Sequence, residues 1–156
     1  IIGLMISLHI VGMYAFSPLI GRIADRISKE LLIGIGAIIA AIGSEIASHT
    51  EAPDAAGHMI GLFLIGIGWC SSLVAGSALM TEAFPPEVRV ATQSTSDVLM
   101  TATGAVAGIS SGLAVEQRSY HDLAHWAALV AVFLAVIASI AVVQQSRIRE
   151  REGDPQ

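Results

Sequence analysis

Five long apolar stretches, joined by short polar connections, constrain this chain more than any other feature of its sequence. They cover residues 1–20, 31–48, 58–81, 91–115 and 123–144. A helix that crosses a bilayer needs roughly 20 mostly apolar residues, because each residue adds about 1.5 Å to a span of about 30 Å. The second stretch is short and the fourth is the most polar. The sequence therefore predicts an all-α fold, a polytopic membrane helix bundle of about five transmembrane helices.

Composition indicates lipid rather than water as the main solvent. Hydrophobic residues make up 54% of the 156 residues and charged residues only 13%, whereas charged residues supply about a quarter of an ordinary soluble domain. The sequence has no long basic run, so nucleic acid is not an expected partner. Cys70 is the single cysteine, which excludes an internal disulfide. We expect it to pack as a small buried hydrophobic residue.

The basic residues predict which end of each helix faces the cytoplasm. Five alternating crossings place seven basic residues at one end of the bundle and leave Arg118 at the other. The seven are Arg22, Arg26, Lys29, Arg89, Arg147, Arg149 and Arg151. By the positive-inside rule, their end is cytoplasmic. We therefore expect a multi-pass protein of the cell (plasma or inner) membrane, with its N-terminal end outside, a transmembrane domain over 1–146 and a cytoplasmic tail over 147–156.

Small residues recur every four positions in three of the stretches and predict close helix packing. The three series are Gly68, Ser72 and Gly76; Gly104, Gly108 and Gly112; and Ala127, Ala131, Ala135 and Ser139. Lipid tails give helices no hydrophobic reason to associate, so membrane helices pack through small side chains that let backbones approach. Plain packing is the simplest interpretation. The alternative adds that glycine faces let helices slide or bend during a conformational change.

The connection between the first two stretches carries a recognisable motif. It reads Gly21-Arg-Ile-Ala-Asp25-Arg26-Ile-Ser28-Lys29-Glu30. Its Gly-x-x-x-Asp-Arg pattern resembles the cytoplasmic loop motif of the major facilitator superfamily of transporters. Three more segments resemble the same family: His9-Ile-Val-Gly12-Met13-Tyr14-Ala-Phe-Ser17-Pro18; Thr81-Glu82-Ala-Phe-Pro85-Pro86-Glu-Val-Arg89; and Ala91-Thr-Gln93 with Asp97.

The resemblance extends over nearly the whole chain and implies a position within a larger fold. The five crossings are similar to helices eight to twelve of twelve, so the chain resembles a C-terminal half fragment. Its first residue, Ile1, is not methionine and already lies inside an apolar stretch, which also predicts a fragment. Two positions depart from the family loop, because Ser28 stands where glycine is usual and Glu30 where a basic residue is expected. These departures weaken the mechanism inferred from the loop motif more than they weaken the resemblance to the family.

The resemblance also implies a role for the loop motif of Gly21, Asp25 and Arg26, with Arg89 from a neighbouring connection. In the family, the acid lies near the N-terminal end of a helix from the opposite half and near basic residues of adjacent loops. Contacts made in one conformation only would bias the outward-facing against the inward-facing state. Arg22 and Glu82 are further candidates for this network. The alternative is that all are solvated charges that only set topology.

Four residues inside the apolar stretches are candidates for substrate binding or coupling. They are His9, Trp69, Gln93 and Asp97. His9 lies about 18 Å from the cytoplasmic end of its helix, near the midplane, where ionisable groups usually face a cavity or a partner. It can bind substrate or take part in proton coupling. Equally, it can hydrogen-bond a neighbouring helix and do nothing more.

Asp97 and Gln93 share one face of the fourth stretch. A carboxylate buried in hydrocarbon is so costly that it must be protonated, paired or wetted, which suits proton coupling. The alternative is a structural partner for an arginine in a helix that this chain lacks. Trp69 lies in mid-helix, away from the usual interfacial belt. Its flat ring suits aromatic or cationic ligands, and packing is the alternative.

The resemblance implies transmembrane transport of a small solute by alternating access, as in secondary active transporters of drugs or metabolites, including proton-coupled ones. The expected partners are membrane lipid, a small-molecule substrate and the missing N-terminal half of the same transporter. One alternative is a non-transporting polytopic membrane subunit. A less favoured alternative is a membrane-embedded enzyme that uses His9 and Asp97. No motif with catalytic or metal-ligand spacing appears, so we expect no enzyme, metal or cofactor.

Overall fold

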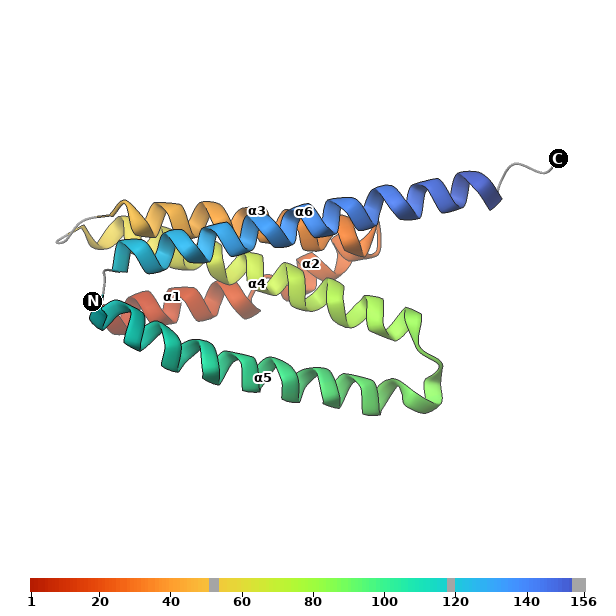
Figure 1. Cartoon of the computed structure of the whole chain (residues 1–156), viewed down its shortest axis with the longest axis horizontal. Coiled ribbons are helices and arrows are strands. Elements are labelled where there is room, and N and C mark those ends of the chain that lie inside the picture. The colour runs from red at the N-terminus through yellow and green to blue at the C-terminus, as the bar shows by residue number, and fades with distance from the viewer. Residues whose placement is uncertain (51–53, 118–119, 153–156) are drawn as a thin grey trace.

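The computed structural model describes residues 1–50, 54–117 and 120–152, and within these ranges the chain is helical without strands (Figure 1). The helices are α1 (Ile2–Tyr14), α2 (Ser17–Ala24), α3 (Lys29–Ser48), α4 (Ala55–Ala83), α5 (Pro86–Gln117) and α6 (Tyr120–Glu152). The predicted all-α fold is confirmed. Each of the five apolar stretches is helical, and the first is divided between α1 and α2. Helix α6 runs through residue 146 without a break.

Three segments are long and apolar enough to cross a membrane. They are Ile2–Ala24, which combines α1 and α2, Lys29–Ser48 and Ala55–Ala83. In α6 the apolar segment His125–Ala141 is shorter. Helix α5 has 32 residues, enough for about 48 Å, but it is not among the candidate spans found in the described residues. Crossing by α5 and α6 therefore stays a prediction that rests on length and topology.

The helices run alongside one another, so the connections gather at two ends. In Figure 1 the α2–α3 turn, the α4–α5 turn and the C-terminal end of α6 lie at one end. The N-terminus and the start of α6 lie at the other. Arg26 in the α2–α3 turn and Arg89 near the start of α5 thus lie at one end of the bundle, as the sequence predicts. Arg118 lies outside the described residues. Which end faces the cytoplasm stays a prediction.

The first membrane segment is broken in the middle by Pro18, near the start of α2. Proline lacks an N–H and clashes with the carbonyl four residues earlier, which here belongs to Tyr14. The Ser17 hydroxyl donates to the Tyr14 carbonyl oxygen at 2.8 Å and supplies the missing hydrogen bond. The break therefore leaves this carbonyl satisfied.

The charged connection after α2 is shorter than the ten residues predicted from the sequence. Gly21 belongs to α2 and Lys29 starts α3, so only residues 25–28 lie between the helices. Ser28 occupies the N-cap of α3, where its hydroxyl accepts from the Leu31 N–H at 3.3 Å. A serine at this position satisfies one of the unpaired N–H groups of the first helical turn. The departure from the family glycine thus has a local structural reason.

Glycines hold α3 and α1 tightly against α4. A Cβ added at Gly43 would lie 2.6 Å from the Gly61 carbonyl oxygen, and one added at Gly36 would lie 2.8 Å from the Gly68 carbonyl oxygen. On the other side of α4, a Cβ at Gly12 would lie 2.6 Å from a backbone oxygen of α4. Of the predicted small-residue series in α4, Gly68 and Ser72 lie at this contact. Gly76, by contrast, has nothing within 4 Å of an added Cβ.

Alanines of α6 pack on α3, but the predicted series is mostly wrong. Ala128, Ala135 and Ala138 are buried, and Ala138 Cβ would lie 3.5 Å from a Cβ added at Gly34. Of the predicted series only Ala135 is buried, Ala131 is half-buried, and Ala127 and Ser139 are exposed. The observed steps of seven and three residues follow the heptad-like spacing of helices that cross at a small angle. A strict four-residue repeat drifts off that contact line.

Helix α5 stands apart from the other helices. It meets α4 at their shared turn and diverges from it toward the other end (Figure 1). Within the part of this chain that the structure describes, no other helix packs on Gly104, Gly108 or Gly112, because a Cβ added at any of them meets nothing within 4 Å, so packing through these glycines stays a prediction. This divergence opens the space that forms the candidate site.

Candidate functional site

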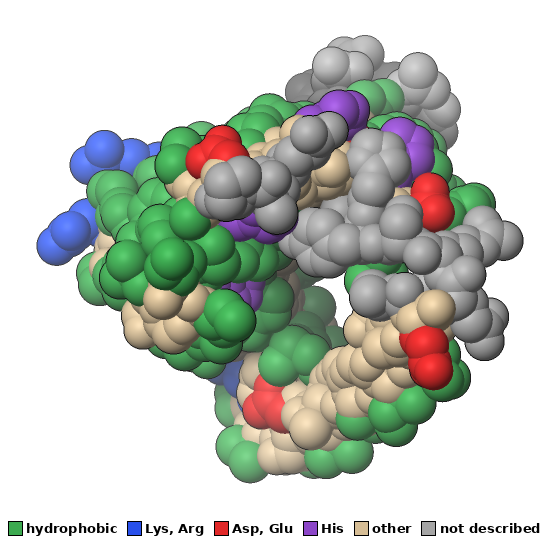
Figure 2. Space-filling model, turned by 90° about the vertical axis from the view of Figure 1, so that its left-hand side faces the viewer, with side chains coloured by type: hydrophobic (Ala, Val, Ile, Leu, Met, Phe, Trp, Pro, Cys, Tyr) green, Lys and Arg blue, Asp and Glu red, His purple; other side chains and the backbone are tan. Residues whose placement is uncertain are grey.

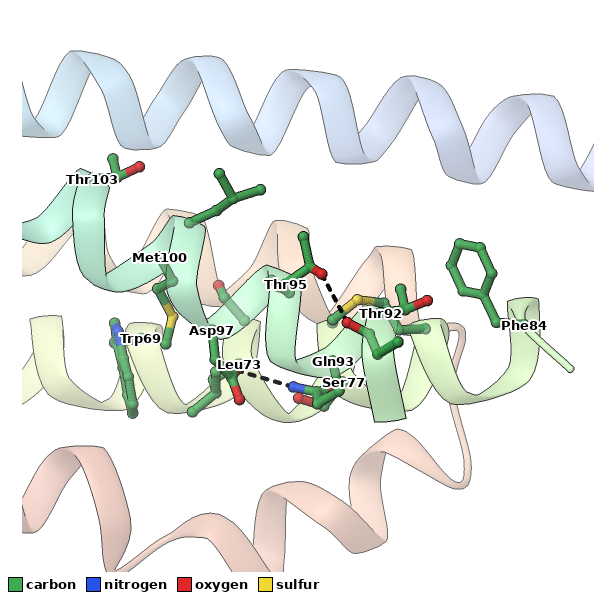
Figure 3. Close-up of a pocket in the computed structure, with 16 residues that line it drawn as sticks. Trp69, Leu73, Ser77, Phe84, Thr92, Gln93, Thr95, Asp97, Met100 and Thr103 are labelled. Carbon is green, nitrogen blue, oxygen red and sulfur yellow. Dashed lines mark hydrogen bonds between the residues drawn. The ribbon is translucent and has the colours of Figure 1, made fainter. Parts of the chain in front are cut away.

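A cavity of about 840 Å³ lies between α4 and α5. Figure 2, which looks onto the end that holds the N-terminus, shows a hollow between α5, at the bottom of the view, and the remaining helices. The residues labelled on the cavity wall in Figure 3 are Trp69, Leu73, Ser77, Phe84, Thr92, Gln93, Thr95, Asp97, Met100 and Thr103. Three of the four predicted intramembrane candidates, Trp69, Gln93 and Asp97, are therefore brought together. His9 does not line this cavity.

Asp97 and Gln93 form the polar centre of the α5 wall. Gln93 Nε2 donates to Asp97 Oδ1 at 3.2 Å, across one turn of the helix (Figure 3). Asp97 is exposed within the described chain, so no other helix of this chain covers the acid. The four-residue spacing that the sequence shows is what lets the two side chains meet. Asp97 faces a space wide enough for water or a solute.

The Trp69 ring packs against another helix and also faces the open cavity beside α4. Its ring meets the Tyr14 ring edge-on, with centroids 5.8 Å apart and planes at 66°. It also lines the cavity, on the opposite wall from Asp97. Edge-to-face contact holds an aromatic ring in a defined orientation. The two interpretations of Trp69, packing and ligand contact, are therefore compatible in the structure.

His9 bridges two helices instead of facing the cavity. It is half-buried, and its Nδ1 lies 2.7 Å from the Leu62 carbonyl oxygen of α4. A carbonyl can only accept, so Nδ1 carries the proton in this contact. This is the hydrogen bond expected from the structural alternative for His9. A coupling role for this residue stays a prediction.

At the basic end, one ion pair joins α3 to α4. Lys29 Nζ lies 2.7 Å from Glu82 Oε1. The sequence proposed Glu82 for a charge network but did not identify Lys29 as its partner. Arg89 instead caps the α4–α5 turn, where its Nε donates to the Phe84 carbonyl oxygen at 2.8 Å. Asp25 is exposed at the C-terminal end of α2.

The remaining loop-motif residues make fewer contacts within this chain. Among the interactions of the described residues, neither Asp25 nor Arg26 forms an ion pair. An added Cβ at Gly21 would meet nothing within 4 Å. The same part of the chain has no cluster of three His, Cys, Asp or Glu residues able to hold a metal ion. The motif residues are therefore open to contacts from outside this chain.

Comparison with known proteins gives a consistent set of relatives. Residues 1–155 match the family model described as Major Facilitator Superfamily. The chain is 36% identical over 134 residues to the uncharacterized MFS-type transporter YddS of Bacillus subtilis, covering 85% of this chain and 30% of the relative. It is 31% identical to the uncharacterized MFS-type transporter YdeG of the same organism, covering 95% of this chain and 33% of that protein.

A third relative has a named solute. The riboflavin transporter RfnT of Brucella anthropi is 27% identical over 139 residues, covering 88% of this chain and 34% of the relative. The chain thus spans about a third of the length of these curated relatives. No solved structure matches the chain.

Proposed function

Because this chain belongs to the major facilitator superfamily, we propose that it supplies part of the solute pathway of a secondary transporter that works by alternating access. The family consists of membrane transporters rather than enzymes, which removes the enzyme alternative. The chain is accordingly a multi-pass membrane protein whose relatives move small solutes. The identity of the solute, the direction of its transport and the coupling ion are therefore part of the proposal.

The observation that carries the proposal is the cavity between α4 and α5. It combines an aromatic ring, hydroxyl groups and a carboxylate in a membrane protein, and its wall includes Trp69 and Asp97. A polar cavity near the bilayer midplane is where transporters of this kind bind their solutes, between two halves that rock against each other. Three residues nominated from sequence, Trp69 on the α4 wall and Gln93 and Asp97 on the α5 wall, line this one cavity.

We infer that the rest of the transporter covers the open side of this cavity. The chain spans about a third of the length of its relatives, and α5 presents Gly104, Gly108 and Gly112 with free space around them. Glycine stripes of this kind let another helix approach closely. The missing N-terminal half, with lipid around the outside, is therefore the expected neighbour of α5.

The proposed orientation follows from the charges. Arg22, Arg26, Lys29 and Arg89 lie in or beside the two turns at one end of the bundle, which the positive-inside rule makes cytoplasmic. The protein then lies in the cell membrane with its C-terminal tail inside. In this orientation the exposed Asp25 can contact the opposite half in one conformation and release it in the other.

Alternating access can be tested without knowing the solute. We would place one cysteine on the cavity wall, in the Thr103→Cys variant of a cysteine-free full-length protein, and label it in vesicles with a membrane-impermeant maleimide. The proposal predicts labelling from both sides, because the cavity opens to each side in turn. The control is Val132→Cys on the exposed surface of α6, which should be labelled from neither side. Labelling of Thr103→Cys from one side only would contradict alternating access.

Proton coupling through Asp97 is the finer part of the proposal. In proteoliposomes of the full-length protein, Asp97→Asn should abolish solute accumulation driven by a pH gradient, since the amide cannot exchange a proton. Thermal stability should stay unchanged, because the side-chain oxygen of asparagine can accept the same hydrogen bond from Gln93. Glu87→Gln, an exposed acid at the start of the same helix, is the matched control and should keep accumulation. If the Asp97→Asn variant still accumulates solute under a pH gradient, Asp97 is not the proton-coupling residue.

A further inference from the structure

The charge on the cavity wall has one sign. Of the residues that the structure places around this cavity, Asp97 alone has an acidic or basic side chain. Its carboxylate receives one hydrogen bond, from Gln93 at 3.2 Å. An ionised carboxylate offers about four acceptor sites. Asp97 therefore keeps acceptor capacity for a donor that enters the cavity, and it repels an anion.

Hydroxyl groups on both walls also present acceptors. Ser72 Oγ of α4 donates to the Gly68 carbonyl oxygen at 3.1 Å, and Thr95 Oγ1 of α5 donates to the Ala91 carbonyl oxygen at 2.8 Å. A hydroxyl has only one proton to donate, so each of these oxygens is left with its lone pairs. Together with Asp97 they make a wall that favours a ligand with N–H donors or positive charge.

The apolar part of the wall suits a flat ring. Figure 3 shows Trp69, Met100 and Asp97 near one another, with Phe84 at the opposite end of the cavity. Methionine sulfur packs well against aromatic rings, and an indole ring attracts cations. Counting along the helices, Trp69 lies about 21 Å from the end of α4 and Asp97 about 17 Å from the start of α5. The ring and the carboxylate therefore differ in depth by about one helical turn.

We propose that this cavity binds a planar organic cation, with an aromatic ring against Trp69 and Met100 and a positively charged nitrogen about one helical turn away at Asp97. The proposal rests on the transport function proposed above, which it narrows to a substrate class. A neutral polyol can donate to Asp97, but it leaves the carboxylate without a counter-ion in the cavity. An anion would meet Asp97 without a compensating cation on the part of the wall described here.

The test is equilibrium binding of ethidium, a planar aromatic monocation, to the full-length protein in detergent, followed by fluorescence polarisation. Asp97→Asn and Trp69→Leu should each raise the Kd roughly tenfold, the order of a desolvated cation–π or ionic contact. Asp97→Glu and Trp69→Phe keep the charge and the flat ring and should retain most of the affinity. Because no pH gradient is applied, a coupling defect cannot imitate a recognition defect.

Matched controls come from residues away from the cavity. Glu87→Gln removes an acid near the start of α5, and Trp126→Leu removes an exposed indole of α6; both should leave the Kd unchanged. Circular dichroism and gel filtration identify variants that fail to fold, and for these the conservative variants decide the result.

Two further planar probes, one neutral and one anionic, test whether binding depends on the positive charge. Riboflavin is neutral and fluorescein is anionic, and both should bind more weakly than ethidium. Equal ethidium affinity in the wild type and Asp97→Asn, or tighter binding of riboflavin or fluorescein, would overturn the cation assignment. Two-sided labelling of Thr103→Cys would still stand in that case, so failure of the substrate class and failure of the transport function can be told apart.

Discussion

Two glycines of α4, eight residues apart, should respond oppositely to the same substitution. A Cβ added at Gly68 would collide with the Gly36 carbonyl oxygen and would lie 2.8 Å from Ala40 Cβ, whereas one added at Gly76 would meet nothing within 4 Å. Real Cβ atoms do not approach backbone oxygen this closely. In Gly68→Ala, α3 and α4 must therefore move apart, and the contacts around Gly36 loosen. In Gly76→Ala nothing has to move.

The size of the effect follows from two opposing terms. Overpacking a tight contact costs typically about 1–3 kcal/mol, and removing a helical glycine gains at most about 1 kcal/mol. The gain is smaller in a membrane, because the unfolded chain there keeps its helices. We therefore expect Gly68→Ala to lower the free energy of unfolding by about 1–2 kcal/mol. Gly76→Ala should change it by less than about 0.5 kcal/mol, in the stabilising direction.

The assay is SDS-induced unfolding of the full-length protein in mixed micelles, followed by tryptophan fluorescence, since Trp69 is next to Gly68 in the sequence. Because the two variants carry the same substitution in the same helix, the difference between them reports the helix contact and not helix propensity. The double variant Gly36→Ala/Gly68→Ala serves as a further check, since two side chains at one crossing should cost more than either alone. Equal losses in Gly68→Ala and Gly76→Ala would refute the packing argument.

Three further predictions concern individual contacts. His9→Leu should lower the free energy of unfolding by about 0.6–1.7 kcal/mol, because it removes the hydrogen bond to Leu62; a changed pH profile of transport in His9→Asn would instead indicate coupling. A double-mutant cycle on Lys29 and Glu82 should give less than about 1 kcal/mol, since the Glu82 side chain is 58% exposed, and a larger value would contradict a solvent-screened pair. The thiol of Cys70, which is 1% exposed, should react with maleimide only after SDS unfolds the protein, and rapid reaction in mild detergent would show that α4 is packed less tightly.

The helices could be predicted from the sequence because lipid imposes simple requirements. Length and hydropathy are enough to locate each one, since every backbone group in the bilayer must be satisfied within its own helix. The ends were less accurate: Gly21 and Lys29 were placed in a loop but are helical. The break before Pro18 had a signal in the sequence, because a proline inside an apolar stretch ends or kinks the helix ahead of it.

Helix partners could not be predicted from spacing. Gly68 and Gly76 occupy equivalent places in one four-residue series, yet only Gly68 meets another helix. The contacts at Gly12 and Gly43 belong to no regular series in the sequence. Which glycine is used depends on where two helices cross, and the crossing point is set by the connections and by the other helices.

In the site, too, contacts between residues close in sequence could be predicted, and contacts between distant residues could not. The pairing of Gln93 with Asp97 follows from their four-residue spacing, which the sequence displays. The approach of Trp69 to the same cavity depends on the α4–α5 turn, and the pairing of Lys29 with Glu82 joins residues 53 positions apart. Residue chemistry identified the candidates, and the fold determined which of them line the same cavity.

The exposed surfaces of this chain differ in the solvent that they can tolerate. On α6, Phe133 and its exposed apolar neighbours can face lipid tails at no cost. Asp97 on α5 cannot, because a charged side chain at the centre of a membrane helix costs about 2.5–3.5 kcal/mol even on lenient scales. The same helix carries the open stripe of Gly104 and Gly108, which offers lipid little to pack against. We infer that α5 faces water and the other half of the transporter, so the openness of the cavity in this chain is the shape of a half-site.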